Sequence, residues 1–216
     1  MQPTLINNGK APDEPYNAVL GFWLPADTPY GNFQLKLMKL CQRMDEANRR
    51  LMDSFAYWDQ CRTAMMSPVN AYERHVYASE QAVYLMRRGA DELIALMWCL
   101  SVFQQAGAYP PRIEVDCIGA ALKKDQELGL APVVDNLDIL RVLNEVSNAF
   151  KHSFVQSDIT LIGRDEPCVH ALALGYNKLE AGVEFYSVSL WELVAGFSAF
   201  YNSGMAWLKE FSQSQR

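Results

Sequence analysis

Two long segments of the chain repeat apolar residues at intervals of three and four, which is the spacing of one buried helical face. The first, residues 31–66, has this spacing at Leu37, Leu40, Cys41, Met44, Leu51, Phe55 and Trp58. The second, residues 70–106, has it at Val83, Met86, Ala90, Leu93, Ile94 and Met97. The break MSPVN separates them, and Gly107 followed by YPPR ends the second. The pattern predicts two antiparallel helices joined by a short connection.

Further helices are expected in the second half of the chain. A short helix is predicted at about residues 115–127, and Pro132 follows it as a breaker. The next helix is predicted from residue 136 to about 154, with Asp135 as its N-cap. The last helix begins at SLWELV and has Ser189 as its expected N-cap.

The stretch CVHALALGYNKLEAGVEFYSV has the alternation and the β-forming residues of two short strands around a turn that contains glycine. We expect a small β-hairpin at about residues 168–187, packed on the helices because an isolated hairpin is only marginally stable. The predicted fold class is therefore mainly all-α. It is an up-and-down bundle of four main helices, with the hairpin inserted before the last helix, in one domain over residues 31–213.

The first 30 residues differ from the rest of the chain in their proline content. Five prolines in this segment disfavour helix and predict an extended N-terminal arm. The segment also contains Phe22 and Trp23, which an arm free in solvent would not need. Two interpretations are open, in which the arm packs on the body of its own chain or across a dimer partner.

Composition narrows the function classes. Half of the 216 residues are hydrophobic, and the net charge is −6 with a pI of about 5.1. This balance disfavours a dedicated non-specific nucleic-acid binder, although a local basic cleft is compatible with it. The longest apolar run, residues 93–103, is shorter than the about 20 residues that a bilayer requires. We expect no membrane segment.

The five cysteines lie singly along the chain, without the spacing of a zinc site. With no secretory signal pattern in the first residues, dispersed thiols favour a reducing, cytoplasmic location. Neither a metal nor another cofactor is expected. His75 and His170 are isolated in the sequence and are expected at the surface or its rim.

One polar stripe stands out on the helix predicted at 136–154. Arg141, Glu145, Asn148 and His152 follow each other at intervals of four, three and four, so they share one face. In one interpretation this face is only solvated, with an Arg141–Glu145 ion pair, and with Lys151 and His152 beside the helix C-terminus. In the other it is a site. His152 would be its general acid or base, Asn148 would contact a ligand, and Lys151 would bind a phosphate.

The stretch SNAFKH, residues 147–152, resembles the motif of the HEPN family of helical bundles. That motif has an arginine, a polar residue, three variable residues and a histidine. Asn148 matches the polar position and His152 matches the histidine. The resemblance implies a homodimer. It also implies, for active members, a metal-independent ribonuclease of the kind found in toxin–antitoxin and phage-defence systems.

The chain departs from this motif at its first position, where Ser147 replaces the arginine that holds the phosphate. Serine has no charge and cannot make a bidentate phosphate contact. Three basic residues could substitute for this arginine: Lys151, Arg141 and Arg88. Arg88 is also expected to pair with Glu92 one turn later.

Three functions follow from these observations. The first is a non-catalytic HEPN-like protein that binds a nucleotide, RNA or a protein partner. The second is an endoribonuclease that uses His152. The third is a protein-interaction adaptor without a ligand site, on which the polar stripe is only solvated.

Overall fold

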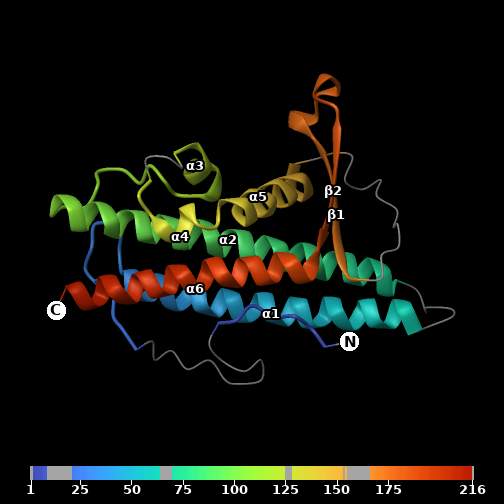
Figure 1. Ribbon diagram of the computed structural model, residues 1–216, viewed down its shortest axis with the longest axis horizontal. Coiled ribbons are helices and arrows are strands. Elements are labelled where there is room, and N and C mark those ends of the chain that lie inside the picture. The colour runs from blue at the N-terminus through green and yellow to red at the C-terminus, as the bar shows by residue number, and fades with distance from the viewer. Residues whose placement is uncertain are drawn as a thin grey trace.

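The computed structural model describes residues 2–8, 21–63, 70–124, 128–152, 154 and 166–215 (Figure 1). Its helices are α1 (Phe33–Thr63), α2 (Ala71–Ala106), α3 (Ile118–Lys123), α4 (Ala131–Val134), α5 (Leu137–His152) and α6 (Leu190–Ser214). Its strands are β1 (Cys168–Leu174) and β2 (Val183–Ser189), with 3-10 turns η2 (Gly175–Asn177) and η3 (Leu179–Ala181) between them. The mainly helical fold class and the hairpin before the last helix are confirmed.

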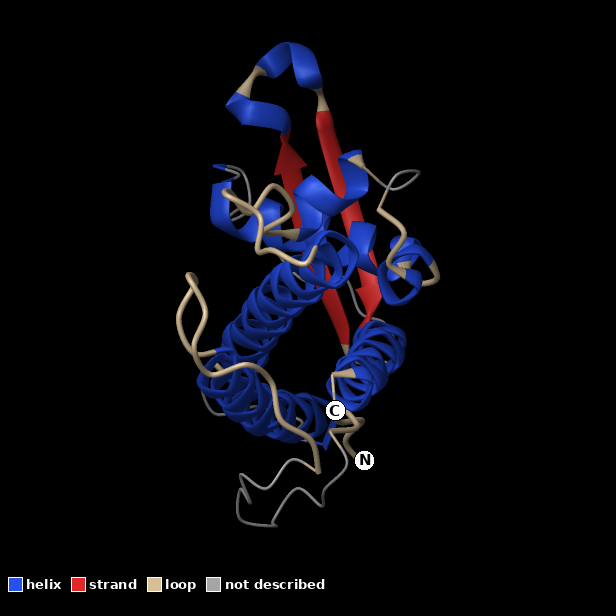
Figure 2. Cartoon of the chain, turned by 90° about the vertical axis from the view of Figure 1, so that its left-hand side faces the viewer, coloured by secondary structure: helices blue, strands red, loops and turns tan. Residues whose placement is uncertain are grey.

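The long helices bury their apolar stripes against each other. Helix α2 contacts α1, α5 and α6, so it lies at the centre of the bundle. Its residues Met86, Leu93 and Met97 have no exposed surface. Gly204 lets α6 approach α2 closely, since a Cβ atom at this position would lie 2.7 Å from Leu93 Cδ2. Viewed along their axes, α1, α2 and α6 form one bundle, with α3, α4 and α5 stacked beside α2 (Figures 1 and 2).

Three expectations about helix ends were wrong. The helix expected at 115–127 is the single short α3, and residues 125–127 lie outside the described part of the chain. Pro132 lies in the first turn of α4, where its missing N–H is tolerated, so it begins a helix here. Asp135, the expected N-cap of α5, is the C-cap of α4. The first carbonyl of the α5 hydrogen-bond pattern belongs to Asn136, which accepts from Leu140 N.

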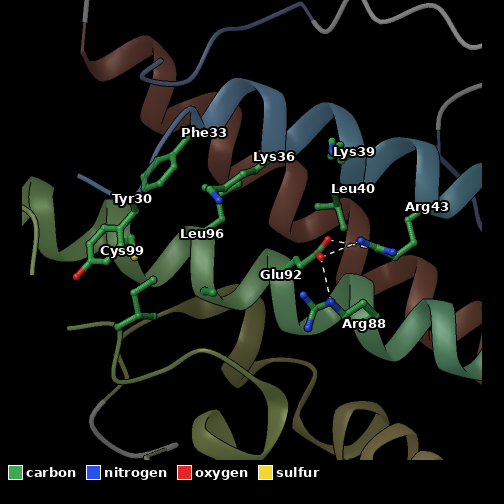
Figure 3. Close-up of a pocket in the computed structure, with 12 residues that line it drawn as sticks. Tyr30, Phe33, Lys36, Lys39, Leu40, Arg43, Arg88, Glu92, Leu96 and Cys99 are labelled. Carbon is green, nitrogen blue, oxygen red and sulfur yellow. Dashed lines mark hydrogen bonds and ion pairs between the residues drawn. The ribbon is translucent and has the colours of Figure 1, made fainter. Parts of the chain in front are cut away.

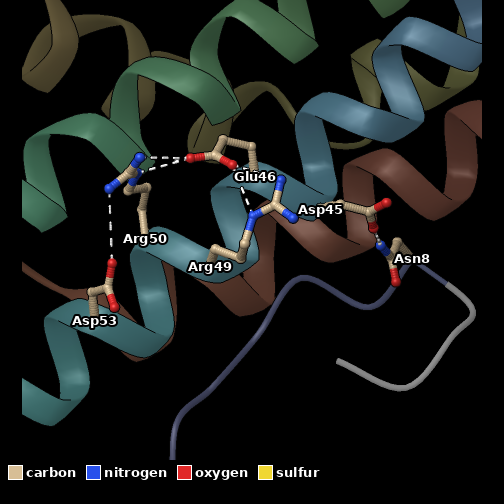
Figure 4. A network of polar contacts seen from close by, with 6 residues as sticks. All are labelled: Asn8, Asp45, Glu46, Arg49, Arg50 and Asp53. Atoms are coloured by element: carbon tan, nitrogen blue, oxygen red, sulfur yellow. Dashed lines mark hydrogen bonds and ion pairs between the residues drawn. The ribbon is translucent and has the colours of Figure 1, made fainter. Parts of the chain in front are cut away.

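The described parts of the N-terminal segment lie extended on the bundle. The backbone of Ile6 and the side chain of Asn48 on α1 exchange two hydrogen bonds of 2.7 and 3.0 Å, and Ile6 is buried. Asn8 donates to Asp45 on the same helix (Figure 4). Phe22 is buried as well, but Trp23 points into solvent with 66% of its surface exposed. The expectation that both aromatic residues pack was therefore wrong for Trp23 within one chain.

The hairpin stands out from the bundle beside α5 (Figure 1). Its strands pair antiparallel from Cys168–Ser189 to Leu174–Val183. Successive side chains point to opposite faces, and Val169 and Ala171 are buried on one of them. Ser189 caps α6, because its hydroxyl accepts from Glu192 N, as predicted. Over the described residues, every helix falls short of the length and apolar character that a bilayer crossing requires.

Candidate functional site

A cavity of about 620 Å³ lies between α5 and the hairpin. From α5 it is lined by Glu145, Asn148 and His152, three of the four residues of the predicted polar stripe. The hairpin completes the lining with Ala173, Leu174, Gly175, Asn177 and Tyr186. The structure therefore gives these stripe residues a second surface, which the site interpretation requires. We call this the α5–hairpin cavity.

Asn177 fixes the tip of the hairpin to the end of α5. Its Nδ2 atom donates to the carbonyl of His152 at 2.8 Å, and its Oδ1 atom accepts from Phe154 N at 2.8 Å. It adopts a left-handed backbone with φ of 53°, which asparagine tolerates better than most residues. The asparagine thus satisfies a carbonyl that the helix end leaves open. Helix α5 therefore ends at His152, short of the predicted residue 154, and Phe154 beyond this end is 83% exposed.

The charged side chains at the α5–hairpin cavity are mostly acidic. The hydroxyl of Tyr186 donates to Glu184 Oε2 at 2.5 Å. Burial raises the pKa of Tyr186, and the carboxylates of Glu184 and Glu145 raise it further. The hydroxyl is therefore protonated at neutral pH. Among the described residues, neither lysine nor arginine lines this cavity, so His152 is the one basic side chain there beside the carboxylate of Glu145.

Arg141 and Ser147 do not take part in the cavity. Arg141 Nη1 lies 3.8 Å from Asp138, one turn earlier, so the expected pair with Glu145 was wrong. Glu145 instead lines the cavity together with Tyr186. Ser147, the residue at the motif arginine's position, is only 4% exposed. It belongs to the buried residues of α5, together with Leu143 and Val146.

Arg88 lies elsewhere. Its Nε atom is 3.0 Å from Glu92, which confirms the predicted pair. Glu92 also binds Arg43 of α1, and all three residues line a separate pocket between α1 and α2 (Figure 3). The neighbouring Arg87 is the one that contacts α5, where it donates to Asn144 at 3.3 Å. Within one chain, Arg88 therefore does not supply the charge that Ser147 lacks.

The basic and histidine residues at the end of α5 are open to solvent. Lys151 and His152 are both exposed in the last helical turn, as the macrodipole interpretation requires. Of these two residues, only His152 lines the cavity. The sequence reasoning missed Asn177 and Tyr186. An asparagine after a glycine in a hairpin turn is a recognisable signal for a left-handed residue, whereas nothing local to Tyr186 indicates its neighbour Glu145.

The expectation for His75 was wrong, because this side chain is 1% exposed. Its Nδ1 atom contacts the hydroxyl of Ser54 at 2.9 Å and the carbonyl of Ser54 at 3.0 Å. Burial lowers the pKa of His75, while the carbonyls of Ser54 and Cys168 act in the opposite direction. The α1–α2 interface, with Trp58 beside the imidazole ring, encloses this histidine. His170 is half-buried on β1.

In the part of the chain that the structure describes, no three histidine, cysteine or acidic side chains converge as a metal site would need. All five cysteines are free thiols. Comparison with protein-family models, with curated proteins and with solved structures finds no match to this chain. What the site does must therefore be inferred from its own geometry.

Proposed function

We propose that this chain is a non-catalytic, HEPN-like binding protein of the cytoplasm that forms a homodimer through the α5–hairpin surface. We define this surface by the α5–hairpin cavity, by Phe154 after α5, and by Val183 and Phe185 on the opposite face of the same hairpin. The observation that carries the proposal is the set of exposed apolar side chains, Phe154, Val183 and Phe185, on a protruding hairpin and the adjoining end of α5.

The charge of the cavity argues against phosphodiester hydrolysis. A ribonuclease site must hold a phosphate and stabilise the negative charge that develops on it. Among the described residues that line the α5–hairpin cavity, His152 is the one basic side chain, and the carboxylate of Glu145 lies in the same lining. Ser147 is buried and Arg88 lines another pocket. The same acidic character disfavours a polyanion such as RNA as the bound partner.

The exposed apolar residues favour a protein partner. Phe154 is 83% exposed, Val183 55% and Phe185 52%, although large apolar side chains gain free energy by burial. Phe185 stacks on His170 with nearly parallel rings, so its position is fixed before any partner binds. Rigid aromatic side chains of this kind are frequent anchors of protein interfaces. The hairpin carries them away from the bundle (Figure 2), where a second protein can reach them.

A second copy of the chain has the charge that this surface needs. The acidic residues Glu145 and Glu184 lie at the cavity, and the exposed lysines Lys151 and Lys178 lie at the end of α5 and at the hairpin tip. A two-fold axis places the same patch of both protomers face to face. A surface with both an acidic centre and a basic rim can therefore be complementary to itself.

Sedimentation velocity over a range of protein concentrations tests this proposal. We expect a dimer that Phe185→Ser weakens by about tenfold or more, as for an interface anchor. Leu35→Ser is the matched control, because Leu35 is 55% exposed on α1 and should leave the dimer unchanged. Glu145→Lys and Lys151→Glu should each weaken the dimer, and their combination should restore it. A wild-type protein that stays monomeric at high micromolar concentration would contradict the proposal.

A further inference from the structure

A second pocket, of about 350 Å³, lies between α1 and α2. The N-terminal segment closes one side with Tyr30, and Ile113 from the connection after α2 closes another. Figure 3 shows Lys36 reaching from α1 toward α2, with the Arg43–Glu92–Arg88 contacts at the far end. The volume is within the range of about 300–1,000 Å³ that small-molecule sites occupy. We call this the α1–α2 pocket.

Positive charge dominates the lining of this pocket. Lys36, Lys39 and Arg43 lie on one face of α1 at intervals of three and four, and Arg88 faces them from α2. Glu92 is the one acidic lining residue. Its carboxylate is shared by two guanidinium groups, at 2.8 Å from Arg43 and 3.0 Å from Arg88. The pocket therefore keeps an excess of positive charge in a chain whose net charge is −6.

The rest of α1 balances its basic residues. Arg49 and Arg50 both pair with Glu46, and Arg50 lies 3.8 Å from Asp53 (Figure 4). In the described residues, Lys36 and Lys39 form no such ion pair. Like charges one turn apart on a helix destabilise it slightly. An anion bound between them would remove this repulsion.

The other lining residues of the pocket are mostly apolar. Phe33, Leu40 and Leu96 are buried lining residues. The hydroxyl of Tyr30 donates to the carbonyl of Pro110 at 2.6 Å, which fixes the ring at the pocket edge. Burial raises the pKa of the Cys99 thiol to about 11, although Lys36 acts in the opposite direction. Cys99 is thus neutral at pH 7 and adds to the apolar wall, with no reactive thiolate in the pocket.

We propose that the α1–α2 pocket binds a small organic phosphate monoester with a flat aromatic body. The ring lies against Tyr30 and Leu96, and the phosphate lies between Lys36, Lys39 and Arg88. Two ammonium groups and a guanidinium fork match a phosphate dianion better than a carboxylate, which has one charge and two oxygens. The site is independent of the α5–hairpin surface, because the two share no lining residue.

Isothermal titration of this chain with 1-naphthyl phosphate, a defined probe, tests the site. We expect micromolar binding that weakens as ionic strength rises. 1-Naphthol, which lacks the charge, should bind at least tenfold more weakly, and 1-naphthoic acid should lie between the two. Absence of binding at millimolar probe, or equal affinity for 1-naphthol, would overturn the proposal.

Two substitutions in the pocket should act in opposite directions. Lys36→Gln should lower the affinity about tenfold or more, because it removes one charge-assisted hydrogen bond. Glu92→Gln should raise the affinity, because it frees Arg43 and Arg88 from the carboxylate that they share. Lys151→Gln, at an exposed lysine outside the pocket, should change nothing. If Glu92→Gln lowered the affinity, or Lys151→Gln matched Lys36→Gln, the assignment of this pocket would be wrong.

Discussion

The α5–hairpin cavity and the α1–α2 pocket are opposite in charge although both lie against long helices of one bundle. The first has Glu145 in its lining and Glu184 beside it, and none of its described lining residues is a lysine or arginine. The second gathers Lys36, Lys39, Arg43 and Arg88 around one carboxylate. Phosphate chemistry therefore fits the second region, whereas the family-like motif lies in the first.

This difference shows that a polar stripe on one helix does not determine the charge of a site. The side chains of α5 face a hairpin that contributes Tyr186 and Asn177, both neutral. The side chains at the start of α1 face Arg88 of α2. In each case the element packed against the helix decides whether the cavity attracts a phosphate. A short stretch of sequence on one helix does not show which element this will be.

The largest effect is expected from reversing the charge of the α1–α2 pocket. Lys36→Glu combined with Lys39→Glu should weaken 1-naphthyl phosphate binding more than a hundredfold, because it replaces two favourable contacts by two repulsive ones. Both residues are exposed, so the fold should survive, and circular dichroism can check this. Titration calorimetry measures the effect. A loss of less than threefold would mean that the basic cluster does not hold the phosphate.

A second prediction concerns the stability of the fold at acidic pH, which limits the pH range in which the two regions can be compared. The pKa of His75 is lowered by burial from its ordinary 6.5, so the unfolded chain binds a proton that the folded chain rejects. The free energy of unfolding should therefore fall as the pH drops below 6.5, by up to about 1.4 kcal/mol per pH unit. Urea unfolding of wild type and His75→Gln at pH 7.5 and 5.5 measures it. An equal pH dependence in both proteins would contradict the prediction.

A smaller effect is expected at the paired arginines of α1. Arg49→Gln should change 1-naphthyl phosphate affinity by less than twofold, because Glu46 already neutralises Arg49 at the surface. The matched comparison is Lys36→Gln on the same helix, titrated under the same conditions. If both substitutions weakened binding equally, the general charge of α1 would be responsible and the pocket would not.

The smallest effect is expected for His152→Ala in an RNA cleavage assay without added metal. Neither wild type nor variant should cleave, because the described lining of the α5–hairpin cavity has no arginine or lysine to hold the scissile phosphate. Gel analysis of a labelled RNA over several hours is sufficient. Cleavage by wild type that disappears in the variant would restore the ribonuclease hypothesis and contradict the proposed function.

The long helices, the hairpin and the cap at Ser189 could be predicted from sequence because each depends on local spacing and propensity. The errors have non-local causes. Helix α5 ends short of the predicted residue 154 because Asn177, from the hairpin, caps it at His152. His75 is buried because α1 and α2 close around it through Ser54 and Trp58.

The candidate site was only partly predictable for the same reason. Glu145, Asn148 and His152 were correctly placed on one face, because that follows from helical periodicity. The α1–α2 pocket was not predicted, since Lys36 and Lys39 resemble any solvated helix surface in sequence. Their significance depends on Arg88 opposite them and on the ion pairs that they do not form, which only the packed structure reveals.

Mapping backbone amide shifts by NMR during a titration with 1-naphthyl phosphate tests the contrast between the two regions most directly. The account predicts that the largest shifts fall in α1 around residues 33–43 and in α2 around residues 88–99, with residues 145–152 unchanged. Shifts concentrated at Asn148, His152 and Tyr186 would contradict it, and would place phosphate recognition at the α5–hairpin cavity instead.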